Sequence, residues 1–212
     1  ENLSASAEDG TPLFTNLNFK VNRGDKISIL SDNALAITAL FEILNGNRKP
    51  DGGSFHYGQT IITSYLPNDN AEFFDTDENL IDWLRQYSEN KDEVYVRGFL
   101  GKMLFTGEET FKSARVLSGG EKVRCMLSRM MLKEGNVLML DEPTNHLDIE
   151  SILWLEDFLN GYAGAVVLVS HDKMFLDHVT NRTIEISLGK IYDFPKPYSK
   201  YLVQRKELRE QQ

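Results

Sequence analysis

The sequence is poor in cysteine, in long apolar runs and in positive charge. Its single cysteine, Cys125, cannot form a disulfide within the 212-residue chain, and a reducing cytoplasm is the expected compartment. No apolar run approaches the about 18 residues that cross a bilayer, so we expect no membrane-spanning segment. The net charge of -9 at pH 7 argues against a broad nucleic-acid-binding face on this chain.

Apolar residues, in contrast, are plentiful. They make up 41% of the chain, which is enough for a sizeable core, and the length allows one or two domains of about 150 residues each. The sequence begins with Glu1 rather than methionine and stops within a charged segment. We therefore expect it to be part of a longer polypeptide.

The segment from 116 to 148 holds most of the candidate chemistry. A predicted helix begins there with four small or polar residues: Ser118, Gly119, Gly120 and Glu121. The free N–H groups and the dipole of a helix start favour an anion such as a terminal phosphate. The same residues also fit an ordinary capping box, with Ser118 as the cap and Glu121 three residues later. Both interpretations stay open at this point.

A second candidate feature follows directly. Residues 137–140 form an uninterrupted apolar run, which is typical of a buried parallel strand, and the run ends in Asp141 and Glu142. Open α/β sheets bind ligands at the carboxyl ends of their strands. We therefore expect Asp141 to hold Mg²⁺ and Glu142 to polarise the attacking water in a phosphoryl-transfer reaction.

Periodicity predicts the remaining elements in outline. Alternation in residues 13–21 and the apolar run 26–30 predict a hairpin-like entry to the core sheet. Further patterns predict a helix at 38–45, two helices between 69 and 116 with the first starting near Thr76, and a helix at 149–160. A buried strand at 165–169, a hairpin at 183–194 and a polar helix at 201–212 complete the expectation.

Four motifs in this order resemble those of an ATP-binding cassette domain. They are LSGGE at 117–121, VLMLDEP at 137–143, PTNHLD at 143–148 and VLVSHD at 167–172, which resemble the signature, Walker B, D-loop and switch-histidine motifs. The Asn145-His146-Leu147-Asp148 form of the D-loop resembles the F subfamily, whose members carry two cassettes in one polypeptide and act on ribosomes.

The resemblance implies a P-loop NTPase-type α/β fold. It would have a mainly parallel core sheet, an N-terminal antiparallel β portion and a helical subdomain. A single cassette would span 1–212, with a core ATPase lobe at 1–68 and 117–195 and a helical subdomain at 69–116 that carries the signature at its edge. The C-terminal helix at 196–212 is either the start of a linker between two cassettes or a solvated terminal helix.

The expected phosphate loop departs from the family pattern G-x-x-x-x-G-K-[ST]. On that frame the chain reads Ser31, Asp32, Asn33, Ala34, Leu35, Ala36, Ile37 and Thr38. Ser31 and Ala36 replace the two glycines, and Ile37 replaces the lysine that faces the β and γ phosphates. A charge-assisted hydrogen bond contributes about 1.5–3 kcal/mol, so the lost lysine alone weakens ATP binding by roughly tenfold to more than a hundredfold. Only Asn33 and Thr38 still match, and the segment also fits an ordinary strand-to-helix connection.

Other roles follow from the resemblance alone. Asn68 stands where a glutamine senses Mg²⁺ and the γ-phosphate, although it also fits a turn. His171 resembles the histidine that contacts the γ-phosphate. The implied cofactors are ATP and Mg²⁺, and the implied metal ligands are Thr38, Asp141 and Asn68.

The combined prediction is a cassette with two half-sites of unequal quality. Its signature, Ser118 to Glu121, would complete the ATP site of a partner cassette, either in the same polypeptide or in a dimer mate, and the ribosome is a further expected partner. Its own site keeps Asp141, Glu142 and His171 but is expected to hydrolyse little. The alternatives are a functional ATPase half, the ATP-binding subunit of a membrane transporter, and a non-catalytic interaction module.

Overall fold

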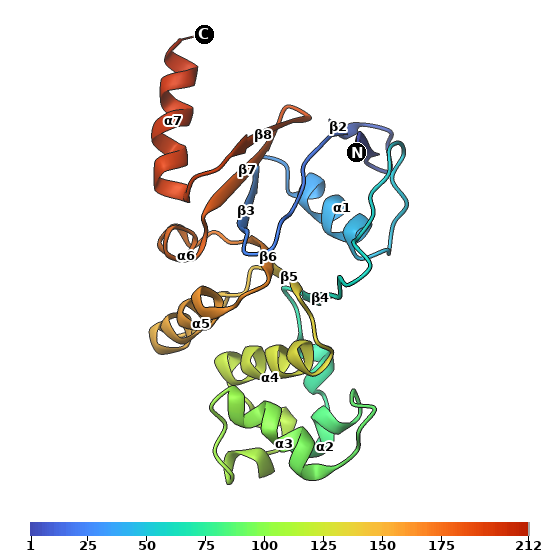
Figure 1. Ribbon diagram of the computed structural model, residues 1–212, viewed down its shortest axis with the longest axis vertical. Helices are drawn as coiled ribbons and strands as arrows, with labels where there is room; N and C mark the ends of the chain where they lie inside the picture. Colours follow the sequence, from blue (N-terminus) through green and yellow to red (C-terminus); the bar gives the residue numbers. More distant parts are fainter. Residues whose placement is uncertain (212) are drawn as a thin grey trace.

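A six-stranded sheet runs through the centre of the computed structural model, which describes residues 1–211 (Figure 1). In spatial order its strands are β4 (Thr63–Leu66), β5 (Val137–Asp141), β6 (Ala165–Val169), β3 (Lys26–Ser31), β7 (Arg182–Ser187) and β8 (Lys190–Phe194). The first five are parallel, and β8 is antiparallel to β7. The predicted mainly parallel core sheet is therefore confirmed.

The register of the central strands brings two motifs side by side. β5 and β6 pair along their whole length, from Val137 opposite Ala165 to Asp141 opposite Val169. Both strands are apolar runs because both faces of the sheet are covered, as is usual for parallel sheets. The residues that follow Asp141 and Val169 therefore lie together at the carboxyl edge.

Two hydrophobic clusters cover the two faces of the sheet. On one face, α1 (Ala34–Leu44) packs with the N-terminal strands against Ile29, Met139 and Val167. On the other, α5 (Ile149–Gly161) and α6 (Lys173–Val179) pack against Leu138 and Leu168 (Figure 1). The sheet edge is thus held between two packed layers.

The N-terminal strands form a separate antiparallel sheet, in which β1 (Leu3–Ser6) pairs with β2 (Pro12–Leu17). The predicted N-terminal antiparallel portion is confirmed, but the predicted hairpin between residues 13–21 and 26–30 is wrong. β3 lies between β6 and β7 instead, because its fully buried Ile27 and Ile29 need a neighbouring strand on each side.

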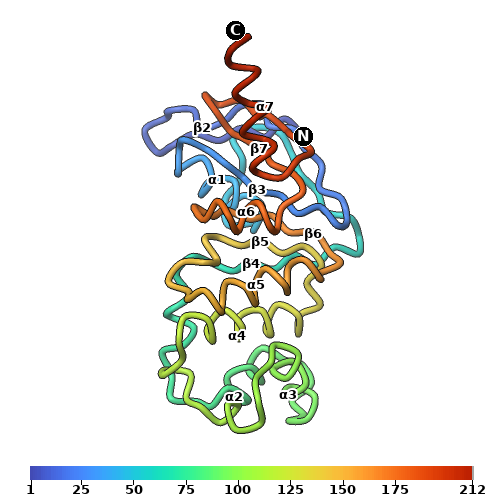
Figure 2. Tube along the Cα trace, turned by 90° about the vertical axis from the view of Figure 1, so that its left-hand side faces the viewer, coloured from blue at the N-terminus to red at the C-terminus, as the bar shows by residue number. Residues whose placement is uncertain are grey.

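The helices that follow β4 lie at one end of the elongated molecule, away from the C-terminus (Figure 2). They are α2 (Leu80–Arg85), α3 (Glu93–Lys102) and α4 (Gly119–Leu132), with short 3-10 turns at Ala71–Phe74, Glu109–Phe111 and Ala114–Val116. Trp83 anchors this region, because its ring stacks on Phe74 at 4.9 Å and its Nε1–H donates to the carbonyl of Phe73. α2 starts at Leu80 rather than near Thr76, since the side chain of Asn79 caps it.

The C-terminal helix α7 (Tyr198–Glu210) is fixed to the sheet through a buried carboxylate. Glu185 on β7 accepts hydrogen bonds from the hydroxyl of Tyr201 at 2.9 Å and from Nε of Arg205 at 2.8 Å. The predicted helix at 201–212 therefore begins three residues earlier, and its last residue lies outside the described part of the chain. Among residues 1–211, no helix is both long and apolar enough to span a membrane.

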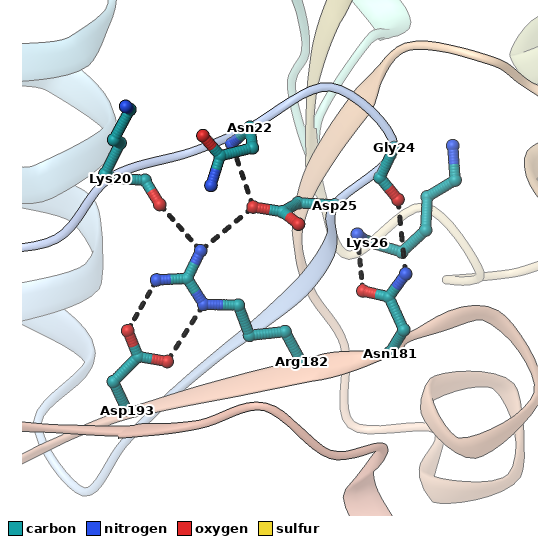
Figure 3. A network of polar contacts seen from close by, with 8 residues as sticks. All are labelled: Lys20, Asn22, Gly24, Asp25, Lys26, Asn181, Arg182 and Asp193. Atoms are coloured by element: carbon teal, nitrogen blue, oxygen red, sulfur yellow. Dashed lines mark hydrogen bonds and ion pairs between the residues drawn. The ribbon is translucent and has the colours of Figure 1, made fainter.

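One arginine ties the amino ends of β3 and β7 to the carboxyl end of β8 (Figure 3). Arg182 at the start of β7 donates to Asp25 before β3 at 3.0 Å, to both carboxylate oxygens of Asp193 on β8, and to the carbonyl of Lys20 at 2.6 Å. Because Arg182 reaches three segments at once, it fixes the edge of the sheet opposite Asp141.

Candidate functional site

The carboxyl edge of the sheet places two acids next to each other. β5 ends at Asp141, and the main-chain N–H of Glu142 donates a 2.8 Å hydrogen bond to the carbonyl of Val169. Glu142 has a φ of +49°, a left-handed conformation that a side chain with a Cβ adopts at a cost. The turn buries Glu142 to 9% exposure and holds its carboxylate at the sheet edge.

Glu142 and His171 are in direct contact. Nε2 of His171 lies 3.2 Å from Oε1 of Glu142, and its main-chain N–H donates to Oε2 at 3.1 Å. Burial raises the pKa of Glu142, and the hydrogen bond and the charge of His171 offset only part of that effect. A buried carboxylate with a raised pKa beside an exposed imidazole is suited to accept a proton from water.

Asp141 is partly occupied by its own chain. The hydroxyl of Tyr65 on β4 lies 3.4 Å from Oδ2 of Asp141 and donates to it. Burial raises the pKa of Asp141. Burial, followed by the charge of Asp141, also raises the pKa of Tyr65 to about 12, so the phenol keeps its proton. The second carboxylate oxygen of Asp141 remains the one suited to a metal.

Asn68 lies at the same edge, in the loop after β4. Its Oδ1 accepts a 2.9 Å hydrogen bond from Nδ2 of Asn145, which belongs to the PTNHLD segment. The structure thus brings Asn68 to the segment that follows Glu142, although 77 residues separate the two asparagines. The carbonyl oxygen that would bind Mg²⁺ is shared with a neighbouring side chain.

The candidate phosphate loop is shorter than expected. α1 begins at Ala34 rather than Thr38, and this correction has a local cause: Oδ1 of Asn33 accepts from the N–H of Leu35 at 3.0 Å and caps the helix. The carbonyl of Asn33 accepts from Ala36, and the N–H of Asn33 donates to Oγ of Ser31. Three N–H groups of this loop are therefore satisfied within the chain.

The side chains of this loop, like its N–H groups, make contacts within the chain. Ala36 is fully buried, and Ile37 packs against the cluster that covers this face of the sheet. The hydroxyl of Thr38 donates to the carbonyl of Ala34 at 3.1 Å, in the way of a serine or threonine inside a helix. None of residues 31–38 has a positive φ. This arrangement is a self-capped helix start that differs from the glycine pattern of the family.

The signature residues form a capping box at the start of α4. Oγ of Ser118 accepts from the N–H of Glu121, and Oε1 of Glu121 accepts from the N–H of Ser118, both at 3.2 Å. Lys112 lies 3.1 Å from the other oxygen of Glu121. Burial would raise the pKa of Glu121, but the hydrogen bonds from Lys112 and Ser118 outweigh it and lower the pKa. The capping interpretation is confirmed, and the exposed start of this 14-residue helix remains available to an anion.

The two signature glycines also have a packing role that the sequence did not reveal. A Cβ at Gly119 would lie 3.1 Å from the carbonyl oxygen of His146, and a Cβ at Gly120 would lie 2.1 Å from Oγ of Ser151. The start of α4 therefore lies directly against the PTNHLD segment and the first turn of α5. The sequence pattern predicted a phosphate contact or a capping box at this position, and neither implies this packing.

Two further parts of the molecule contain cavities. One, of about 820 Å³, opens at the amino ends of the strands and is lined in part by Asn136, Phe158 and Tyr162. The other, of about 430 Å³, lies between β4 and α4 beside Tyr65 and Arg129. No periodicity or motif pointed to either cavity, because each is made by segments that are far apart in the sequence.

The sheet topology, the acid pair at the end of β5 and the adjoining histidine define an ATP-binding cassette of the P-loop NTPase type. Residues 14–145 match the family model described as ABC transporter. The chain therefore belongs to the ABC transporter family.

Several curated proteins are similar to most of this chain. An uncharacterized ABC transporter ATP-binding protein, YkpA of Bacillus subtilis, is 50% identical over 92% of this chain and 36% of its own length. The probable ATP-binding protein YbiT of Escherichia coli O157:H7 is 37% identical over 92% of this chain and 37% of its length. ABC transporter F family member 5 of Arabidopsis thaliana is 35% identical over 90% of this chain and 28% of its own length. The chain thus spans about a third of the length of these relatives.

Solved structures confirm the fold. The chain is similar to cbiO1 of Clostridium perfringens, part of the ABC transporter complex cbiONQ, with a TM-score of 0.76 at 19% identity over 99% of this chain and 92% of that one. It is also similar to the dimeric bacterial ABC transporter cassette MJ0796, with a TM-score of 0.71 at 15% identity. The match covers 92% of this chain and 97% of that one.

Proposed function

We propose that this chain is one cassette of a cytoplasmic tandem-cassette ATPase of the F subfamily, which acts with the ribosome in translation. The Asn145-His146-Leu147-Asp148 motif and the similarity to ABC transporter F family members support this assignment. The relatives YkpA and YbiT are about two and a half times as long as the chain, which supports a second cassette in the same polypeptide.

The observation that carries the proposal is the contrast between two half-sites. The phosphate loop uses the N–H groups of Asn33, Leu35 and Ala36 within the chain, and the partly buried Ile37 packs against the core cluster. Ser118 and Gly119, in contrast, are exposed at the start of α4. In our proposal the chain donates its signature to the ATP of a partner cassette and holds ATP of its own weakly.

We also propose roles for the residues at the chain's own nucleotide site. If ATP and Mg²⁺ bind, Asp141, Asn68 and Thr38 are the proposed metal ligands, and the first turn of α1 faces the phosphates. Glu142 is the proposed base, since it is buried and held by His171. His171 is the proposed contact to the terminal phosphate.

Calorimetric titration of the chain with MgATP tests the weakness of its own site. We expect no saturable binding below about 1 mM, because the loop has no lysine and three of its N–H groups are already bonded within the chain. Micromolar binding would contradict this part of the proposal.

The donated signature is tested in the parent polypeptide. Ser118→Arg places a long charged side chain where the partner's phosphate would lie, and we expect ATP turnover to fall at least about tenfold. Ser118→Thr is the matched control, because threonine also caps helices and should keep most of the turnover. Equal turnover in both variants would reject signature donation and would favour a non-catalytic interaction module.

A second candidate is a cassette that hydrolyses ATP in its own right. The contacts between Glu142 and His171 favour it, because they provide a positioned base despite the altered loop. Glu142→Gln in the parent polypeptide should then lower turnover, whereas an unchanged rate would reject this candidate.

A transporter subunit is the remaining alternative, suggested by the names of relatives and structural neighbours. Sedimentation of the parent polypeptide separates it from our proposal. We expect the protein with ribosomes, and its recovery with membranes would contradict the ribosomal assignment.

A further inference from the structure

A cavity of about 820 Å³ opens at the edge of the sheet opposite the acids. Its walls come from the turn before β3, the lead-in to β4 and the end of α5. β5 connects it to the acid edge, because Val137 lines the cavity and Asp141 lies four residues further on, roughly 13 Å away. The volume falls in the range of about 300–1,000 Å³ that small-molecule pockets occupy.

One wall of the cavity is aromatic. Phe158 and Tyr162 of α5 line it, and their rings stack with an interplanar angle of 23°. Trp154, one turn earlier on the helix, continues the stack at 5.6 Å and 16° from Phe158. The regular spacing along α5 therefore presents flat, nearly parallel rings, against which a planar ligand can pack.

Hydrogen bonds hold the walls in place. The hydroxyl of Tyr162 donates to the carbonyl of Gly135 at 2.6 Å. The side chain of Asn136 accepts from the N–H of Ile62 and donates to the carbonyl of Thr60, both at 2.8 Å. Because these bonds join α5, the segment before β5 and the lead-in to β4, these walls are fixed before any ligand arrives.

The charges around the cavity favour an anion. Arg23 lines it and forms no ion pair with any residue between 1 and 211. Lys26, whose main chain belongs to the network of Figure 3, is buried, and its ammonium lies 4.8 Å from the centre of the Tyr162 ring. Within the described residues, that ammonium donates to the carbonyls of Tyr162 and Gly164 and to no other group. The lining itself carries one cation, Arg23, and one acid, Asp157, and the buried ammonium of Lys26 behind the wall adds a second positive charge.

We propose that this cavity binds a small molecule with a flat aromatic body and one anionic group. The aromatic body packs on Phe158 and Tyr162, and the anion is held by Arg23, with Lys26 adding a favourable potential behind the wall. The site is separate from the candidate nucleotide edge and does not depend on the function proposed above.

Anilinonaphthalene sulfonate is a suitable probe, since it carries a flat naphthalene ring and one sulfonate and fluoresces when it leaves water. Fluorescence and calorimetric titration of the chain should give one saturable site. We expect Arg23→Gln to weaken binding about tenfold, through loss of a charge-assisted hydrogen bond. Asp157→Asn should tighten it about two- to threefold, because a repelling charge is removed.

Two further variants locate the dye. Ala163→Trp fills the mouth of the cavity with a side chain from its own lining and should abolish saturable binding. Arg97→Gln, on α3 far from the cavity, is the matched control for Arg23→Gln and should leave the affinity unchanged. All variants should keep the circular dichroism spectrum of the parent chain. Absence of saturable binding, or an affinity that Arg23→Gln and Asp157→Asn leave unchanged, would overturn the proposal.

Discussion

Nε2 of His171 lies 3.2 Å from one carboxylate oxygen of Glu142, and the main-chain N–H of the same histidine donates a 3.1 Å hydrogen bond to the other. One residue thus contacts both oxygens of an acid that is only 9% exposed. The pair joins the segments that follow β5 and β6, so the orientation of Glu142 is set by the sheet rather than by a mobile loop.

The burial of Glu142 predicts a pH-dependent stability. The pKa of Glu142 in the folded protein lies above its ordinary value of 4.5. Between pH 4.5 and that raised pKa, the folded state binds more protons than the unfolded state. Stability contributed by this group is therefore lost as the pH rises through that window. Glu142→Gln removes the cost of ionising this buried carboxyl, and we expect the free energy of unfolding at neutral pH to increase.

Urea denaturation at neutral pH and at about pH 4 provides the measurement. The difference between Glu142→Gln and the parent chain should shrink at the lower pH, where the carboxyl is protonated in both states. The exposed Glu108 supplies a control, and its replacement by Gln should change stability little at either pH. A destabilised Glu142→Gln variant at neutral pH would contradict the expectation.

The packing of the signature helix predicts opposite effects for two glycine substitutions. Gly120→Ala should destabilise the chain by about 1–3 kcal/mol, because the new Cβ overlaps the side chain of Ser151. Gly98→Ala, in the exposed interior of α3 with no atom within 4 Å, should stabilise it by about 0.5–1 kcal/mol. Thermal unfolding of both variants measures the contrast, and equal effects would show that Gly120 is not closely packed.

The altered phosphate loop predicts a gain of binding when its pattern is restored. The triple variant Ser31→Gly, Ala36→Gly, Ile37→Lys should bind MgATP at least about tenfold more tightly than the parent chain, because it regains a cation and a flexible loop. The double variant that keeps Ile37 is the control and should gain less. Calorimetry measures the affinity, and absence of any gain in the triple variant would show that another defect limits the site.

The anchoring of α7 predicts local release of the helix when one arginine is removed. Arg205→Gln leaves the buried carboxylate of Glu185 without its closest cation, and we expect α7 to open more easily by about 3 kcal/mol. Lys206→Gln is the control, since that side chain is 78% exposed and its ion pair with Glu210 contributes little. Hydrogen exchange of residues 198–210 measures the opening. Equal protection in the two variants would exclude this anchor.

Local patterns were sufficient to predict the elements that depend on nearby residues. The apolar runs at 137–140 and 165–169 became β5 and β6, and the hairpin of β7 and β8 follows from the turn at Leu188 and Gly189. α5 starts where Asp148 caps it and ends at Gly161. Each of these features is determined within a few residues.

Features that depend on distant segments were not predictable in this way. The strand β1 was missed because its partner, β2, was assigned to a different neighbour. The early start of α1 depends on the side chain of Asn33, which the glycine pattern of the family had obscured. The contact of Gly120 with Ser151 and the cavity beside Tyr162 join segments that only the fold brings together.

The ties between α7 and Glu185 make this helix a lever arm. It has 13 residues and is therefore about 20 Å long, and Figure 1 shows it projecting beyond the sheet. Because Tyr201 and Arg205 clamp its first turns to β7, the helix turns with the strand. A tilt of the sheet by about 10° would swing the far end of a 20 Å rod by about 3 Å, so small rotations within the core are amplified at the tip.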